Sequence, residues 1–237
     1  MKSILREVLP RVYSTLYGWK EAVRLGYHDI GRDRKKKAAR YQLDVEKVGK
    51  PLTEVFWKAW ESQANGRSGA VTGDLLTTDT STVNIKGYPH PFHFRQNGSD
   101  LSMMCQIFYH REYEAVQSLG EVCTIIDCGA NIGCSIVYLL SLFPKAKIVA
   151  FEPDPANFKV LTRNVSGYGD QVLLLNKAVW SSSCGLKIVM PDDGMNCSIS
   201  VREVASGETP DVEALSVGDA MDLLGVDKVD LVKMDIE

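Results

Sequence analysis

The first 60 residues carry an apolar pattern with a helical period. Their apolar side chains recur at steps of three or four, which places them on one face of a helix. A second helix is expected at about residues 52–63. Between these stretches, residues 32–40 form a basic run, which we interpret as a solvated helix face or linker rather than a patch for an acidic lipid, glycan or nucleic acid. The apolar stripe of the first stretch consists of Ile4, Val8, Val12, Leu16 and Trp19.

Residues 65–69, with the sequence NGRSG, interrupt the helical pattern and mark a boundary. We therefore expect a helical N-terminal extension over residues 1–75 and a second domain over residues 76–237.

The second domain begins with two short stretches of alternating apolar and polar residues, 82–86 and 91–95. The turn-forming sequence GYPH separates them, so they predict a β-hairpin. A helix is expected next, with Ser99 or Asp100 at its N-cap, running to about Tyr113.

From residue 122 onward, apolar runs of strand length alternate with helical stretches. This alternation predicts an α/β fold with a parallel, doubly wound sheet. Residues 178–204 suggest an antiparallel excursion between the third and fourth strands. The expected strands are 123–127, 147–151, 171–175 and 229–236; the expected helices are 132–143, one with Asp154 as N-cap and Pro155 as its first residue, and 217–224.

The net charge of −3 conceals an asymmetry along the chain. Residues 1–60 carry 14 Lys and Arg against 7 Asp and Glu, whereas residues 61–237 carry 13 against 23. Phosphate binding depends on clustered Lys and Arg, so the acidic larger part argues against nucleic acid as the main partner.

The six cysteines form no CxxC pair and have no histidine at zinc-finger spacing, so we expect no metal site. Three of them lie on or beside the first expected strand, where a reduced thiol packs well. No signal peptide and no apolar run of about 18 residues is visible. We therefore expect a protein of the reducing cytoplasm without a membrane span.

The candidate chemistry lies where the first expected strand passes into a helix. Asp127 ends the strand, and Gly129, Asn131 and Gly133 form the turn. We expect Gly129 to let the backbone approach a ligand closely and Gly133 to let the following helix pack against the strand, and asparagine is a common choice where φ must be positive. Glu152 ends the next strand, 19 residues after Gly133. An acid at this place can accept hydrogen bonds from both ribose hydroxyls of a nucleotide ligand.

Three interpretations of this turn compete: S-adenosylmethionine, a nicotinamide dinucleotide, or a turn that needs glycine only for packing. A dinucleotide fold calls for GxGxxG, whereas the order from Gly129 is GANIGC. Asp127 favours a ligand with a cationic amino group, as S-adenosylmethionine has. The strand-end Glu152 at the correct distance argues against the packing interpretation.

Four motifs of the second domain resemble the FkbM-type S-adenosylmethionine-dependent methyltransferases. They are IIDCGANIG (125–133), FEPDP (151–155), NKAVW (176–180) and DLVKMDIE (230–237), and residues 94–113 resemble the segment that precedes them in this family. The resemblance covers about residues 80–237 and implies a Rossmann-like methyltransferase sheet.

The resemblance also implies O-methylation of a hydroxyl on a sugar, a glycan or a secondary metabolite. Asp235 and Glu237 at the end of the fourth strand are then candidates for positioning or deprotonating the acceptor. The cofactor S-adenosylmethionine is expected to contact Asp127, Gly129, Ala130, Asn131, Gly133, Glu152, Pro153 and, less securely, Ala178.

The family pattern continues beyond the fourth strand, whereas this sequence ends at Glu237. We therefore expect a sheet truncated after the fourth strand, with an apolar edge. This leaves two further hypotheses open: an inactive remnant that still binds the nucleoside, and, less favoured, an NAD-dependent oxidoreductase.

Overall fold

The computed structural model describes residues 34–64, 80–96, 99–190 and 199–236. The apolar stripe expected near the N-terminus, the boundary at residues 65–69 and Glu237 lie outside these ranges. Of the expected N-terminal helices, the structure describes α3 (Arg34–Val48) and α4 (Lys50–Ala64), joined at Gly49. Val48 and Leu52, on either side of this junction, share one apolar core with Val137 and Tyr138 of the second domain.

The expected hairpin is present as β1 (Ser81–Val83) and β2 (Phe92–Phe94), which pair antiparallel. The expected single helix after it is shorter and interrupted. It consists of α5 (Asp100–Met104) and the π-helical turn η1 (Cys105–Tyr109), and the 3-10 turn η2 (Glu114–Ser118) follows. The helix ends before Tyr113 because Arg111 adopts a positive φ of 54°, which no helix accommodates.

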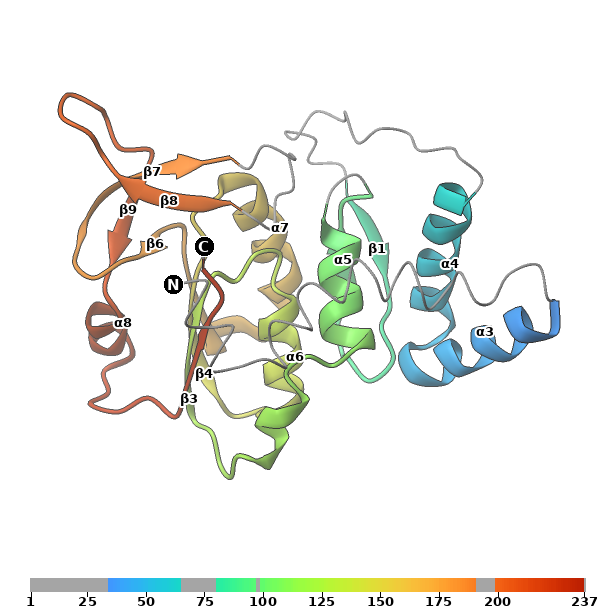
Figure 1. Cartoon of the computed structure of the whole chain (residues 1–237). Coiled ribbons are helices and arrows are strands. Elements are labelled where there is room, and N and C mark those ends of the chain that lie inside the picture. Colours follow the sequence, from blue (N-terminus) through green and yellow to red (C-terminus); the bar gives the residue numbers. More distant parts are fainter. Residues whose placement is uncertain (1–33, 65–79, 97–98, 191–198, 237) are drawn as a thin grey trace, which may run out of the picture.

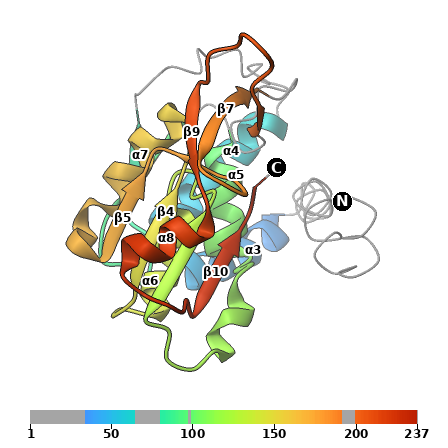
Figure 2. The ribbon, with the colours of Figure 1, turned by 90° about the vertical axis from the view of Figure 1, so that its left-hand side faces the viewer.

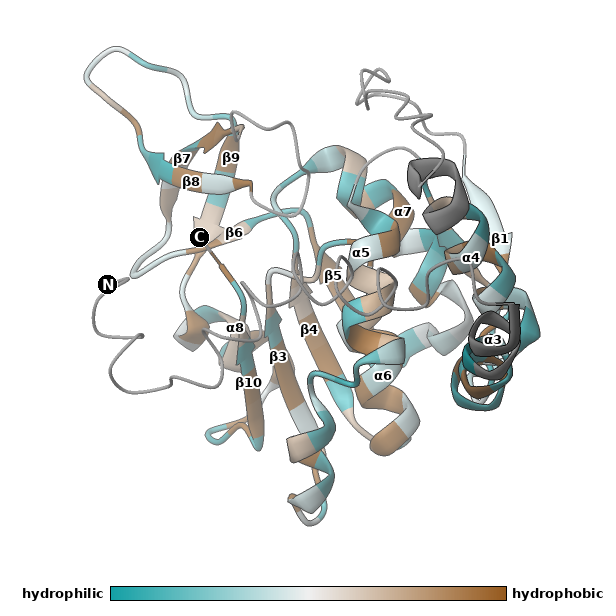
Figure 3. Ribbon diagram, turned by 45° about the vertical axis from the view of Figure 1, so that its right-hand side comes forward, coloured by the Kyte–Doolittle hydropathy of each residue, from teal (hydrophilic) through white to brown (hydrophobic). Residues whose placement is uncertain are grey.

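A four-stranded parallel sheet forms the centre of the molecule, in the order β10-β3-β4-β5. The expected strands are confirmed with ends shifted by one or two residues. The central strands are mainly apolar, and Figure 3 shows β3 and β4 mostly in brown. These two strands read as continuous apolar runs because both of their faces are covered, whereas Val232 and Met234 of β10 are exposed. The bounds of the central strands are β3 (Thr124–Cys128), β4 (Lys147–Phe151), β5 (Val172–Leu175) and β10 (Leu231–Met234).

Helices cover both faces of this sheet (Figures 1 and 2). The helices α6 (Cys134–Leu142) and α7 (Pro155–Val165) pack on one face, and α8 (Val217–Leu224) packs on the other. The predicted start of α7 is confirmed, since Asp154 accepts a hydrogen bond from the backbone N–H of Asn157. The 3-10 turn η3 (Ser166–Gln171) leads from α7 to β5.

The expected antiparallel excursion forms a second sheet, in the order β6-β9-β7-β8. It lies above α8 and the carboxyl ends of the central strands in Figure 1. The sequence pattern did not predict the parallel pairing of β6 with β9, because two residues are too few to show alternation. The strands are β6 (Ala178–Val179), β7 (Cys184–Val189), β8 (Ser200–Glu203) and β9 (Val212–Leu215).

Within the described ranges, no helix combines the length and the apolar composition that a membrane crossing requires. The described His, Cys, Asp and Glu side chains form no group of three or more that could hold a metal ion.

Candidate functional site

The turn after β3 has the backbone geometry that its sequence predicts. Gly129, Asn131 and Gly133 all have positive φ, at 88°, 50° and 92°. The prediction for Asn131 is therefore confirmed. The backbone N–H groups of Gly129 and Ala130 both donate to the carbonyl of Phe151, at 3.0 and 2.8 Å, which fixes the turn against the end of β4.

The two glycines of the turn make room for different neighbours. A Cβ on Gly129 would collide with the backbone carbonyl oxygen of Asp235, beyond the end of β10. A Cβ on Gly133 would lie 2.9 Å from Leu161 of α7. Gly133 therefore allows packing against helix α7 and not only against the strand, whereas Gly129, expected to let the backbone approach a ligand, lets the turn approach the segment after β10.

Glu152 is buried at the carboxyl end of β4, directly beside the turn. One of its oxygens, Oε2, accepts from the backbone N–H of Asn131 at 2.7 Å. The other, Oε1, accepts from the backbone N–H of Asp154 at 3.0 Å and from Nδ2 of Asn157 at 3.4 Å. Burial raises the pKa of Glu152 to about 7, and the hydrogen bonds oppose this rise. The side chain is thus an ordered acceptor whose charge changes near neutral pH.

Asp127 is completely buried and paired within the chain. Ser135 of α6 donates to its Oδ2 at 2.5 Å, and the ammonium of Lys233 lies 2.9 Å from its Oδ1. Lys233 also donates to the carbonyl of Gly129 at 2.5 Å. Burial alone would lower the pKa of Lys233, but the carboxylates of Asp127 and Asp235 more than compensate and hold it above its usual value.

This pairing changes the argument about Asp127. Its carboxylate does not need a cationic ligand, because Lys233 already supplies the opposite charge, and a direct contact with a cofactor stays a prediction. Sequence reasoning missed both Lys233 and Ser135. One signal was present: Lys233 lies two residues after Leu231, which places a lysine on the same, less exposed face of β10 as that leucine.

Asp235 is at the mouth of the site, with its side chain 61% exposed and 3.8 Å from the ammonium of Lys233. The charge of Asp235 also reaches the segment after η1, where Gln106 donates to the Glu112 carboxylate. Burial raises the pKa of Glu112, and Asp235 adds to the rise. Burial likewise raises the pKa of Tyr113, again with a contribution from Asp235, so Tyr113 stays a neutral phenol. The charge of Asp235 thus acts on both Glu112 and Tyr113.

The remaining predicted residues are backbone or packing positions. Ala130 is buried in the core beneath α6 and α7, and the carbonyl of Pro153 accepts from Asn176 at 3.2 Å. Ala178 is buried in the core of the second sheet with Leu186 and Val212, away from the turn's hydrogen bonds. The cofactor contacts predicted for all three stay predictions.

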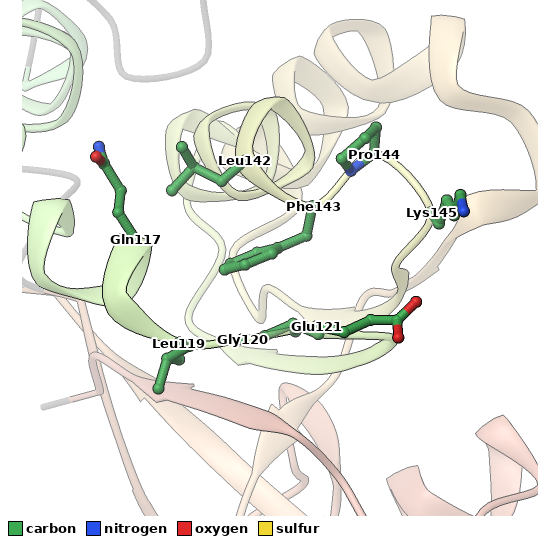
Figure 4. A pocket seen from close by; sticks show the side chains of 9 residues that line it. Gln117, Leu119, Gly120, Glu121, Leu142, Phe143, Pro144 and Lys145 are labelled. Carbon is green, nitrogen blue, oxygen red and sulfur yellow. The ribbon is translucent and has the colours of Figure 1, made fainter.

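A cavity of about 410 Å³ lies at the other end of the central sheet (Figure 4). Its lining includes Val122, just before β3, and Phe143 and Lys145, just before β4. Ligands of open α/β sheets bind at the carboxyl ends of the strands. The convergence of Asp127, Glu152 and Lys233, rather than this cavity, therefore marks the candidate site.

Part of the chain matches known proteins. Residues 127–237 match the family model described as the methyltransferase FkbM domain, which confirms the resemblance over this segment. The chain is 50% identical over 42 residues to Methyltransferase sdnD of Sordaria araneosa, covering 18% of this chain and 16% of that protein. It is 37% identical over 60 residues to Methyltransferase 1 of Beauveria bassiana (strain ARSEF 2860), covering 25% of this chain and 24% of that protein.

The alignments thus span 16% and 24% of the length of these two curated relatives. A crystal structure of a proposed transferase from Pyrococcus horikoshii is 19% identical, with 43% of this chain and 37% of that chain covered and a TM-score of 0.31. A likeness at this TM-score does not establish a shared fold.

Proposed function

We propose that this chain, whose residues 127–237 match the FkbM methyltransferase domain, uses S-adenosylmethionine to methylate a hydroxyl of a small-molecule or glycan acceptor. The observation that carries the proposal is Glu152, an ordered buried carboxylate hydrogen-bonded to the backbone of the turn after β3. An acid at the end of the second strand is the usual ribose acceptor in nucleotide-binding α/β folds.

The strand order supports the same location. From β3 the chain adds β4 and then β5 on one side, and later places β10 on the other side of β3. The carboxyl ends of β3 and β10 therefore flank a topological switch point, where open α/β sheets bind their ligands. A Rossmann-like methyltransferase sheet is the architecture that this order supports.

The residues at the switch point fit an adenosyl ligand with an amino-acid tail. Glu152 would accept from the ribose. The Gly129 carbonyl would accept from the amino group of the tail, whereas Asp127, whose charge Lys233 already balances, would hold Lys233 and the turn in place. A dinucleotide fits less well, because the turn lacks the GxGxxG pattern. Without these glycines the backbone cannot approach a pyrophosphate as closely.

S-adenosylmethionine supplies an activated methyl group on a sulfonium when bound. The chain would have to hold the acceptor hydroxyl in line with the methyl–sulfur bond, which would break as the C–O bond forms, and take up the proton of the hydroxyl. Asp235 is exposed at the mouth of the site and is our candidate to accept this proton. Glu112 and Tyr113, on which the charge of Asp235 acts, are candidates to position the acceptor. Glu237 stays a second candidate from the sequence.

Calorimetric titration with S-adenosylhomocysteine and, separately, with NADH tests the cofactor class. We expect saturable binding of the first and none of the second. A folded chain that binds NADH and not S-adenosylhomocysteine would contradict the proposal. Methyl transfer from labelled cofactor to hydroxylated acceptors would then separate an enzyme from the alternative, a nucleoside-binding remnant without turnover.

A further inference from the structure

Four buried polar side chains link Glu152 to the segment between β2 and α5, residues 95–100, which we call the β2–α5 corner. They come from segments far apart in the sequence, and none has more than a few per cent of its surface exposed. This series of side chains begins at Asp100 (0% exposed) and continues through Arg95 (4%) and Asn157 (1%) to Glu152 (4%).

The first link is a bidentate ion pair. Asp100 Oδ2 accepts from the backbone N–H of Arg95 at 2.7 Å and from its Nε at 2.9 Å. Asp100 Oδ1 accepts from Nη2 of Arg95 at 2.7 Å. Two parallel hydrogen bonds to a planar guanidinium fix its orientation as well as its position.

The second link determines how Asn157 is turned. Nη2 of Arg95 also donates to Oδ1 of Asn157 at 2.6 Å. Arginine has no acceptor, so the amide oxygen of Asn157 has to face it. The amide nitrogen must then face the other way, where Oε1 of Glu152 lies at 3.4 Å. Arg95 therefore ensures that Asn157 offers Glu152 a donor and not an acceptor.

Stability alone does not account for this arrangement. Burying an ion pair costs desolvation free energy that the attraction often fails to repay. In addition, Nη1 of Arg95 is buried and has no hydrogen-bond partner among the described residues. An unpartnered buried donor is costly, so the orientation of Asn157 is a better explanation of why the arginine lies here.

The donors around Glu152 also limit what it can still accept. A carboxylate has about four acceptor sites, two on each oxygen. Oε1 already accepts from Asp154 and Asn157, and Oε2 accepts from Asn131. One site on Oε2 is left. This narrows the expectation from the sequence that Glu152 accepts from both ribose hydroxyls.

We propose that Arg95, acting through Asn157, is a positioning residue that leaves Glu152 able to accept from a single ribose hydroxyl. The inference rests on the proposed adenosyl cofactor. It places the β2–α5 corner, which precedes the matched residues 127–237, in the cofactor site.

Adenosine, 2′-deoxyadenosine and 3′-deoxyadenosine are the probes that test this. In the wild-type chain we expect one deoxy analogue to bind about ten- to a hundred-fold more weakly than adenosine, the size of one hydrogen bond to a carboxylate. The other analogue should bind within about threefold of adenosine. Equal losses for both analogues would overturn the single-hydroxyl geometry.

Two variants test the role of the hydrogen bonds from Arg95 to Asn157 and from Asn157 to Glu152. Asn157→Leu removes the hydrogen bonds to Arg95 and to Glu152, whereas Asn157→Asp keeps a partner for Arg95 but presents an acceptor to Glu152. We expect each variant to lose the difference between the two deoxy analogues. Because Asn157→Asp retains a partner for Arg95, the test does not depend on how well Asn157→Leu folds. A difference that survives in a folded Asn157→Asp chain would overturn the positioning role.

Asn164 provides a matched control on the same helix. It is equally buried and bonds the backbone of His93 and Ile132, but its bonds do not reach Glu152. Asn164→Leu should lower the melting temperature but keep the difference in affinity between the two deoxy analogues. If Asn164→Leu also lost that difference, the effect of the Asn157 variants would be merely structural and the proposal would be overturned. If the wild-type chain binds neither adenosine nor S-adenosylhomocysteine, the proposed function fails instead.

Discussion

Backbone conformation at single residues defines the turn of the candidate site. Positive φ at Gly129, Asn131 and Gly133 could be predicted, because glycine and asparagine are the residues that tolerate it. The ion pair of Asp127 with Lys233 could not be predicted. Its two partners lie on different strands, 106 positions apart, and no local pattern joins them.

Gly129→Ala should lower the free energy of unfolding by more than the strain of a positive φ alone would. Any side chain there is strained, at a cost of about 1–3 kcal/mol, and a Cβ would also collide with the carbonyl of Asp235. Gly87 has nearly the same φ, 89°, but open space around it. In urea unfolding we expect Gly129→Ala to cost about 1–3 kcal/mol more than Gly87→Ala. Equal losses would show that the contact with Asp235 does not constrain the turn.

The affinity for S-adenosylhomocysteine should depend on pH through Glu152. Its pKa of about 7 means that the carboxyl carries a proton below neutrality. The charged form is the stronger acceptor, so binding favours it and releases a proton at low pH. We expect the affinity to be constant above about pH 7.5 and to fall below pH 7 by up to about tenfold per pH unit. Glu152→Gln should bind weakly with a flat profile, and an equally steep profile in that variant would assign the titration to another group.

At the scale of elements, the bounds of the strands inside the sheet could be predicted best. β3, β4 and β5 are continuous apolar runs, and the observed ends differ from the predicted ones by a residue at most. The segment after α5 was predicted less well, because a π-helical turn and the positive φ of Arg111 have no periodic signal. β10 is attached to β3 by apolar contacts and also by the buried ion pair between Lys233 and Asp127.

Lys233→Met should show how much this charge contributes to the attachment. The substitution keeps the length of the side chain but leaves the Asp127 carboxylate buried without its ion pair. Breaking one side of a buried pair typically costs about 3–5 kcal/mol, and we expect a loss of that order in urea unfolding. Adding Asp127→Asn should restore part of it. A single-variant loss below about 1 kcal/mol would mean that water reaches Asp127 and compensates its charge.

The edge strand β10 should promote self-association. Of the strands described, it pairs with β3 alone, and Val232, Met234 and Ile236 on its other face are substantially exposed. Exposed apolar edges favour pairing with another chain. In sedimentation velocity, Met234→Lys should reduce the associated fraction, whereas Leu43→Lys, at the same 60% exposure on helix α3, should not. An equal effect of both would point to general hydrophobicity instead of the edge.

At the scale of the whole molecule, the sequence predicted a doubly wound α/β arrangement, and the structure confirms the parallel sheet with helices on both faces. The packing of the N-terminal helices was not predicted, since Val48 and Leu52 share a core with Val137 and Tyr138. The link from Arg95 and Asp100 through Asn157 to the candidate site was not predicted either. Such long-range contacts depend on how the elements are assembled, which local periodicity does not encode.

The central claim is that an adenosyl cofactor binds at the carboxyl ends of β3 and β4, with its ribose on Glu152. The most direct test is the ratio of S-adenosylhomocysteine affinities of the wild-type chain and Glu152→Ala, measured by calorimetry. We predict that the variant stays folded and binds about ten- to a hundred-fold more weakly. An unchanged affinity in the folded variant would contradict the claim.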